Sequence, residues 1–236
     1  TRASYYDEIS AMVKHLTASG INSKIGVVYQ DDGFGNAALK IVRQVLAEQK
    51  LPEPVAAPLA KQTYEATAAV AALSAAAPDA IIMATSGDAS VNFIREYNKT
   101  GRYTLFLGLS VVSGNKLVQE LGTEADGVII TQVVPSPWAQ KSQIVREFHQ
   151  DLSAIPENAN IEINYSTLEG YIAARVLVEA LRRAGPDVTP AKVRSALENM
   201  RNLSLGGFDI NFGHGNNTGS TYTDLSMLRS TGRYIQ

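Results

Sequence analysis

The stretch at residues 25–38 reads IGVVYQDDGFGNAA. Its first five residues are apolar and mostly β-branched, which is typical of a strand buried in a parallel sheet. A loop over residues 30–35 follows, and beyond it Leu39, Val42 and Leu46 lie on one face of a predicted helix. A strand, a loop and a helix in this order form the repeating unit of α/β sheets.

The same unit recurs through the first half of the chain. Apolar residues at helical spacing predict an opening helix that ends at Gly20. Further strands are predicted at 80–84, 104–107 and 127–131, and further helices from an N-cap at Thr63 to about Ala77, at 88–99 and at 115–121. Strands and helices that alternate at this spacing predict a parallel sheet with helices on both faces.

The pattern changes after the Pro-Ser-Pro sequence at 135–137. Three amphipathic helices are predicted at 142–153, 167–184 and 190–199, with no strand between them, and β-structure returns only at 208–212 and 221–228. Amphipathic helices need an apolar surface to cover, and no second sheet of adequate size is predicted. We therefore expect the sequence to be part of a larger protein.

Composition excludes several classes of protein. The 236 residues are 45% apolar and 19% charged, with a net charge of -2 and no cysteine. Clustered Lys and Arg, as in a nucleic-acid surface, are not found, and no apolar run approaches the roughly 18 residues of a membrane span. Without cysteine there are no disulfides, thiolate nucleophiles or zinc fingers. The N-terminus lacks the apolar region of a signal peptide, so we expect either a cytosolic chain or a processed or truncated product.

The loop after the first strand matches the dinucleotide fingerprint loosely, through Gly33, Gly35 and Ala38. Asp31 and Asp32 precede the predicted helix and would repel a pyrophosphate at its N-terminus. A ligand-facing or purely structural strand-to-helix turn is therefore favoured over dinucleotide binding.

No catalytic or metal constellation is predicted. The sequence from Gly108 to Val112 resembles the G-x-S-x-G turn of hydrolases, but Val112 replaces the last glycine. The histidines are not spaced as metal ligands; they stand at positions 15, 149 and 214. Ser110 is instead expected in a loop at the carboxyl end of a strand, where open α/β sheets bind ligands.

Glu169 and Tyr165 lie near the start of the long predicted helix, and the sequence allows two interpretations of each. Glu169 is placed in the first turn, where it either stabilises the helix dipole or pairs with an ammonium group of a ligand. Tyr165 is either a core aromatic or part of the wall of a ligand cleft.

Four segments together resemble the type I periplasmic solute-binding proteins of ABC transporters, of the branched-chain (Leu/Ile/Val) amino acid class. They are Arg2–Tyr5 with Asp7 and Glu8, Tyr29–Gly35, Thr131–Pro135 and Leu168–Arg175. Each is weak alone, but their order and spacing are specific.

The resemblance implies two α/β lobes that are joined by three crossovers and close on a ligand by hinge motion. Residues 1–134 would form the second lobe, 135–206 would return to the first lobe as helices, and 207–236 would supply a hinge crossover and the final strands of the second lobe. The first lobe would lack its N-terminal part, which holds the main carboxylate contacts of the family.

The resemblance also suggests ligand contacts, residue by residue. Phe34 matches an aromatic residue that packs on the ligand, and Tyr165 lies near a position that touches it. Ser110 matches a position where amino acid binders often carry an acid, so the serine is a departure. The full predicted set is Asp32, Phe34, Thr85, Ser86, Ser110, Tyr165 and Glu169.

The function expected from the sequence is that of a periplasmic solute-binding subunit of an ABC importer. Its ligand would be an amino acid or similar small carboxylate, and its protein partner the transporter permease. Neither a cofactor, a metal, nucleic acid nor enzymatic activity is expected. A ligand-sensing regulatory domain of the same fold and a nucleotide-dependent enzyme are the alternatives.

Overall fold

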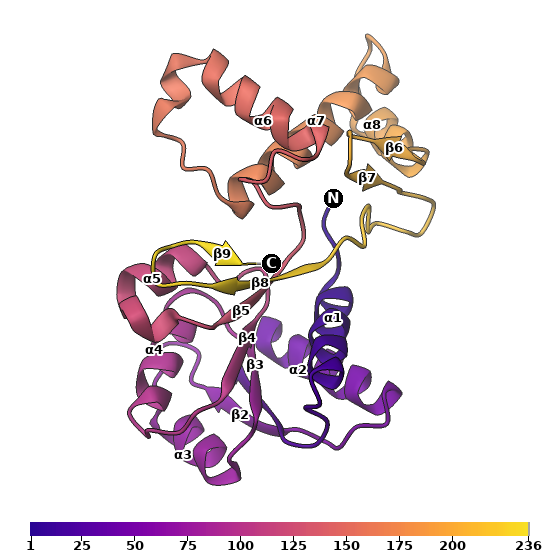
Figure 1. Ribbon diagram of the computed structural model, residues 1–236. Helices are drawn as coiled ribbons and strands as arrows, with labels where there is room; N and C mark the ends of the chain where they lie inside the picture. The colour runs from indigo at the N-terminus through magenta and orange to yellow at the C-terminus, as the bar shows by residue number, and fades with distance from the viewer. Residues whose placement is uncertain (236) are drawn as a thin grey trace. The chain divides into compact units, whose positions relative to one another are not determined.

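The computed structural model describes residues 1–235, without the side chains of residues 158 and 159 (Figure 1). The chain divides into two compact units. Unit 1 comprises Thr1–Ser4 and Val133–Thr223, and unit 2 comprises Tyr5–Gln132 and Asp224–Gln236. The chain therefore passes between the units after Ser4, Gln132 and Thr223.

Unit 2 is built on a seven-stranded sheet with the order β2-β1-β3-β4-β5-β8-β9. The first five of these strands are parallel, and β8 and β9 are antiparallel to their neighbours. The strands are β1 (Ile25–Gln30), β2 (Val55–Leu59), β3 (Ala80–Ala84), β4 (Leu105–Gly108), β5 (Ile129–Gln132), β8 (Asp224–Leu228) and β9 (Tyr234–Ile235). The predicted fold class, a largely parallel α/β sheet, is confirmed.

Helices cover both faces of this sheet (Figure 1). They are α1 (Tyr5–Ala18), α2 (Gly33–Glu48), α3 (Thr67–Ala76), α4 (Gly87–Asn98) and α5 (Gly114–Leu121), with a 3₁₀ turn at Gly122–Ala125. Successive side chains of a strand point to opposite faces, so Val27 packs against α1 and α2 while Val28 joins the core under α3 and α4. Both valines are fully buried.

Unit 1 consists of helices and a short hairpin. Its elements are α6 (Gln143–Ala154), a 3₁₀ turn at Pro156–Asn160, α7 (Tyr165–Ala184), α8 (Pro190–Glu198), β6 (Leu203–Ser204) and β7 (Asp209–Ile210). The antiparallel pair β6–β7 and the inner faces of α6 and α7 share one core, in which Phe148, Ile172 and Ile210 are buried. The outer face of α7 exposes Leu177, Val178 and Leu181.

Two strands of unit 2 were not predicted from the sequence. β2 contains Pro58, which cannot donate to a neighbouring strand, and the structure accommodates it because β2 lies at the edge of the sheet. β9 is only two residues long. The predicted strands at 208–212 and 221–228 are shorter, at Asp209–Ile210 and Asp224–Leu228.

The predicted starts of two helices were wrong. α3 begins at Thr67 instead of after Thr63, and Glu65 accepts a hydrogen bond from the Thr67 amide at 2.7 Å. α7 begins at Tyr165 instead of Thr167, because Asn164 and Thr167 form a reciprocal capping box. Tyr165 is thus the first residue of the helix.

Residues 1–4 and 207–223 group with unit 1. The resemblance placed residues 1–4 in the second lobe and residues 207–236 in a hinge crossover and the final strands of that lobe, and this assignment to lobes stays a prediction. Residues 207–223 group with unit 1 because Phe208 and Ile210 are buried in the core of α6 and α7. Among the described residues, no helix is long and apolar enough to cross a membrane.

Candidate functional site

The carboxyl ends of β1, β3 and β4 lie next to one another along one edge of the unit 2 sheet. Five of the seven predicted ligand residues follow these strand ends. They are Asp32, Phe34, Thr85, Ser86 and Ser110. The topology therefore gathers them at one edge, and the edge beyond the carboxyl ends of parallel strands is where open α/β sheets bind ligands.

Gln30, which sequence reasoning missed, joins two of the loops at this edge. Its side-chain oxygen accepts hydrogen bonds from the amide and the hydroxyl of Ser86, at 2.7 and 3.0 Å. Its amide nitrogen donates to Asp32 at 3.2 Å. Gln30 is buried as the last residue of β1, and it holds the loops after β1 and β3 in fixed positions.

Asp32 caps α2. Its Oδ1 accepts from the Gly35 amide at 2.9 Å, while its Oδ2 accepts from Gln30. The turn needs glycine at 35, because a Cβ there would lie 2.0 Å from the carbonyl oxygen of Gln30. Both carboxylate oxygens of Asp32 are thus engaged within the chain, and these two bonds hold the loop against α2 and β1.

Phe34 is half-buried in the first turn of α2. Its ring packs edge-to-face against Tyr5, with the ring centroids 5.4 Å apart. The pair gives the edge an apolar surface beside its polar loops. The geometry agrees with the predicted aromatic wall and leaves its contact with a ligand a prediction.

Thr85 and Ser86 differ in exposure. Thr85 is fully buried, and its hydroxyl lies 2.8 Å from that of Ser90 at the start of α4. Ser86 is half-buried. Thr85 therefore joins the loop after β3 to α4 through a buried hydrogen bond. Ser86 is the one of the two whose side chain reaches the surface of unit 2.

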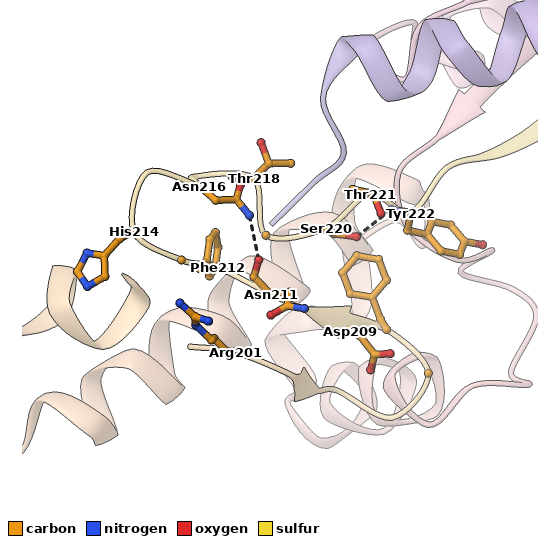
Figure 2. Close-up of a pocket in the computed structure, with 14 residues that line it drawn as sticks. Arg201, Asp209, Asn211, Phe212, His214, Asn216, Thr218, Ser220, Thr221 and Tyr222 are labelled. Carbon is orange, nitrogen blue, oxygen red and sulfur yellow. Dashed lines mark hydrogen bonds between the residues drawn. The ribbon is translucent and has the colours of Figure 1, made fainter. Parts of the chain in front are cut away.

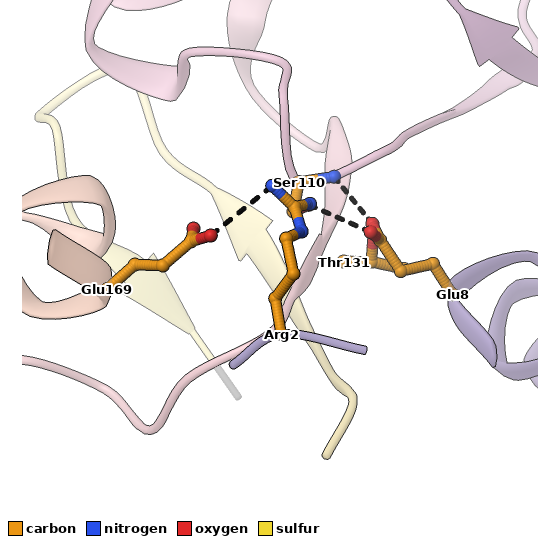
Figure 3. A network of polar contacts seen from close by, with 5 residues as sticks. All are labelled: Arg2, Glu8, Ser110, Thr131 and Glu169. Carbon is orange, nitrogen blue, oxygen red and sulfur yellow. Dashed lines mark hydrogen bonds and ion pairs between the residues drawn. The ribbon is translucent and has the colours of Figure 1, made fainter. Parts of the chain in front are cut away.

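Ser110 contacts the buried carboxylate of Glu8 on α1 (Figure 3). Glu8 accepts hydrogen bonds from the Ser110 amide at 2.8 Å and from the Ser110 hydroxyl at 3.0 Å. Thr131 on β5 donates a further bond to the same carboxylate. Its position on an amphipathic helix gave no sign of this role, because only the tertiary structure brings α1 against β4 and β5.

The other two predicted residues, Tyr165 and Glu169, belong to unit 1. Tyr165 packs edge-to-face against Trp138, with centroids 5.4 Å apart. Glu169 pairs with Arg2, whose Nη1 lies 3.4 Å from its Oε1 (Figure 3). Glu169 is the fifth residue of α7 and so lies beyond the first turn in which it was predicted. Its structural partner is therefore the Arg2 guanidinium and not the positive end of the helix dipole.

Unit 1 also contains a pocket of about 800 Å³, formed by the β6–β7 hairpin and the loop that follows it (Figure 2). Polar side chains from 209–222 line most of it, together with Arg201. None of the seven predicted residues lines this pocket, and it does not lie at the carboxyl edge of a parallel sheet. Within residues 1–235, no group of three His, Cys, Asp or Glu side chains could hold a metal ion.

Comparison with known proteins gives consistent results. A model of a family described as periplasmic binding protein matches residues 1–233. No curated protein matches the chain. A substrate-binding periplasmic protein from Ralstonia solanacearum is 32% identical, with a TM-score of 0.89 over the whole of this chain and 67% of the other.

Two further solved structures share the fold at lower identity. A possible leucine/isoleucine/valine-binding protein from Rhodopirellula baltica is 24% identical, with a TM-score of 0.91 over all of this chain and 65% of the other. A branched chain amino acid ABC transporter from Thermus thermophilus with bound valine is 20% identical, with a TM-score of 0.79 over 98% and 64%. The chain therefore spans about two thirds of the length of these structures.

Proposed function

Because this chain belongs to the periplasmic binding protein family, we propose that it captures a small solute for an ABC importer. The family is one of binding proteins and not of enzymes. The observation that carries the proposal is the family match, which extends over both units. Residence in the periplasm and a transporter permease as partner belong to the same proposal.

The ligand site that we propose includes the carboxyl edge of the unit 2 sheet. Binding sites for small molecules combine apolar walls with a few fixed polar groups. Phe34 supplies such a wall, and Ser86 and Ser110 supply polar groups whose positions are fixed by Gln30 and Glu8. Asp32 and Thr85 then hold the loops, while Tyr165 and Glu169 are proposed as contributions of unit 1.

Unit 2 is proposed as the second lobe of such a protein and unit 1 as part of the first, with capture by hinge closure. Two observations support this assignment. The solved relatives are about half as long again as this chain, and α7 exposes Leu177, Val178 and Leu181. An exposed apolar helix face of this kind marks a surface for packing, and we propose that residues outside this chain cover it.

An amino acid or similar small carboxylate is the proposed ligand class. The support is the likeness to the valine-bound and leucine/isoleucine/valine-binding structures, which at 20% and 24% identity share the fold. Neither an aromatic wall nor serine hydroxyls select among small carboxylates by themselves.

The test begins with the intact mass of the protein purified from its source, compared with the 25.4 kDa of this chain. A thermal-shift screen of that protein follows, against the amino acids, small carboxylates and, as controls for the nucleotide-dependent alternative, NAD and NADP. A ligand at 100 times its dissociation constant stabilises the folded state by about 2.7 kcal/mol. A rise in melting temperature with one amino acid or carboxylate supports the proposal, whereas a response to NAD alone, or to no solute, contradicts it.

A further inference from the structure

Three connections join the two units, the first after Ser4, the second after Gln132 and the third after Thr223. On the unit 2 side of these connections lie four polar side chains that are each at most 3% exposed, those of Glu8, Thr131, Gln132 and Ser226. They form two hydrogen-bonded pairs. Each pair joins two of the three connections within unit 2.

Strand β5 contributes one residue to each pair. Thr131 and Gln132 are its last two residues, so their side chains point to opposite faces of the sheet. Thr131 donates to Glu8 on α1 at 2.5 Å (Figure 3), and Gln132 donates to the hydroxyl of Ser226 on β8 at 2.8 Å. The end of β5 therefore holds both the element that follows the first connection and the element that follows the third.

The pair on β8 fixes a register. A buried polar group loses its hydrogen bonds to water, so it needs a partner within the protein. The antiparallel pairing of β5 with β8 covers only Ile129–Gln132 and Asp224–Met227, and so short a pairing depends on its side chains for its register. Gln132 and Ser226 satisfy each other in one register only, and this register determines where β8 begins relative to the end of β5.

The same connections are also held within unit 1. Arg2 pairs with Glu169 before the first connection. Directly after the second, Val134 is buried in the core of α6 and α7. Before the third, the ring of Tyr222 packs on Phe208, with the centroids 5.8 Å apart. Only short stretches of chain therefore remain between an anchor in one unit and an anchor in the other.

We infer that the two buried pairs set the stiffness of the hinge between the units, because they keep the free part of each connection short. The effect is largest for Gln132 and Ser226. Without this pair, the next fully buried residue of β8 is Leu228, so the free part of the third connection extends from Ser226 to Leu228. The inference rests on the proposed function, in which the units close on a solute. Gln132 and Ser226 are positioning residues in it, which act through the hinge.

Hinge stiffness affects solute binding through entropy. A protein whose open form has more freedom loses more conformational entropy on closing, and its apparent affinity for the solute falls. A loss of stability by itself leaves the dissociation constant of the folded protein unchanged. The dissociation constant therefore distinguishes a hinge role of the pair from a merely structural one.

The first experiment measures the hinge without a solute. This chain has no cysteine, so Lys40→Cys on α2 and Ala191→Cys on α8 place one spin label at an exposed position of each unit. The labels are attached to the protein expressed from its complete gene, with any cysteine outside this chain replaced by serine. Double electron–electron resonance gives the distribution of the distance between them. We expect Ser226→Ala and Gln132→Leu to broaden this distribution.

A double variant tests whether the two residues act as a pair. If they do, Gln132→Leu combined with Ser226→Ala should broaden the distribution no further than the more disruptive single variant. The second experiment is titration calorimetry with the solute identified in the screen. Because closure must then order additional freed backbone, we expect each single variant to bind the solute about fivefold more weakly.

Thr104→Val is the matched control. Thr104 is buried, and its hydroxyl donates to the Pro78 carbonyl at 2.9 Å. This variant also loses one buried hydrogen bond of unit 2, at the amino end of β4 and away from the three connections. It should lower the melting temperature while the distance distribution and the dissociation constant stay as they are.

The outcomes separate this inference from the proposed function. An unchanged distance distribution in Ser226→Ala overturns the inference, whether or not a solute is found. A broader distribution with an unchanged dissociation constant also overturns it and leaves solute capture intact. If Gln132→Leu does not fold, Ser226→Ala decides alone, because it removes only one hydroxyl. Failure of the unaltered protein to bind any solute of the screen contradicts the proposed function, and the distance measurement then decides whether the pair stiffens the hinge.

Discussion

The two units of this chain bury their apolar residues to different extents. In unit 2, helices cover both faces of a seven-stranded sheet, and the strands β1 and β3 are buried almost throughout. In unit 1, the helices pack on a two-stranded hairpin, and α7 leaves Leu177, Val178 and Leu181 exposed by 50, 45 and 37%. Two strands of two residues are too small a surface for three helices.

The comparison shows that amphipathic helices with the same sequence pattern bury different amounts of apolar surface. The amount depends on the size of the sheet against which they pack. The helices of unit 2 pack on the seven-stranded sheet of the same unit, and the apolar faces of the helices and of the sheet are buried against each other. Those of unit 1 bury only their inner faces. Unit 2 therefore has the organisation of an independent folding unit, and unit 1 that of a structure whose outer surface is suited to further packing.

The largest effect is expected from a cavity in the core of unit 2. Phe93 on α4 is fully buried and contacts Tyr97 and Phe106, at centroid distances of 5.7 and 6.2 Å. Phe93→Ala should lower the free energy of unfolding of unit 2 by about 3–5 kcal/mol. Denaturant titration followed by far-UV circular dichroism measures this change.

Tryptophan emission distinguishes the two units in the same experiment. Trp138 is the single tryptophan of the chain and belongs to unit 1, where it packs on Tyr165. If the units unfold separately, Phe93→Ala shifts the dichroism transition and leaves the emission transition in place. Equal shifts in both signals would show that the units unfold as one, and the comparison between them would lose its energetic basis.

The second effect concerns the exposed face of α7. The 236-residue chain on its own should self-associate through this face, because apolar side chains gain free energy by leaving water. The double variant Leu177→Lys with Leu181→Lys should raise the dissociation constant of the self-associated form roughly 100-fold. Sedimentation equilibrium measures it.

The matched control lies on unit 2. Tyr103 is 93% exposed there, and Tyr103→Lys removes an isolated apolar side chain. The dissociation constant for self-association of Tyr103→Lys should match that of the unaltered chain. A monomer at all concentrations before any substitution would refute the idea that unit 1 presents a surface for packing.

The third effect tests whether the edge of unit 2 binds the solute. Phe34→Ala in the protein from its complete gene should weaken solute binding by roughly 1–3 kcal/mol, because the burial of an aromatic ring is lost. Tyr103→Ala, which removes an aromatic ring from the same unit away from this edge, should bind as before. Titration calorimetry with the solute identified in the screen gives both constants, and an unchanged constant for Phe34→Ala would remove it from the site.

The smallest effect is a pH dependence confined to unit 1. The Arg175 guanidinium on α7 donates to Glu147 on α6 at 2.6 Å, and this bond, helped by Gln143, lowers the pKa of Glu147 below its usual 4.5. A carboxyl group with a lowered folded-state pKa stabilises the fold above its ordinary pKa and loses that contribution as the pH falls through the folded value. We expect a small destabilisation of unit 1 below pH 4.5.

Trp138 emission during denaturation at pH 6 and pH 4 measures this effect. Glu147→Gln should have the lower stability at pH 6 and a weaker dependence on pH in this range. The contribution is small because the pair is partly exposed, with side-chain exposures of 37 and 29%. An equal pH dependence in Glu147→Gln would assign the effect to other carboxyl groups.

Much of unit 2 could be predicted from the sequence because its signals are local. The buried strands β1 and β3 are nearly continuous apolar runs, and strands that alternate with helices predict a parallel sheet because the connections between parallel strands are right-handed crossovers. β2 was missed because its short run of small apolar residues is interrupted by Pro58, which argues against a strand unless that strand lies at a sheet edge, as β2 does. The limits of α3 and α7 depended on caps, which are side-chain choices among several candidates.

The sequence predicted that the loops of the proposed site lie at one sheet edge, but not the contacts that support them. The loops that carry Asp32, Ser86 and Ser110 follow recognisable strands, so the sequence indicated that they share an edge. Gln30 and Glu8 were missed, since a buried glutamine in a strand and a glutamate in an amphipathic helix carry no local signal of their partners. Those partners lie 56 and 102 residues away.

The sequence by itself determined the class of the sheet, the helices and buried strands of unit 2 other than β2 and β9, and the loops at the carboxyl edge, because each depends on periodicity and turn chemistry within a few residues. Only the tertiary structure decided that residues 207–223 belong with α6 and α7, that Arg2 pairs with Glu169, and that Glu8 accepts a hydrogen bond from Ser110. These contacts join residues distant in the chain, and they form because burial forces each polar group to find a partner wherever the packing brings one.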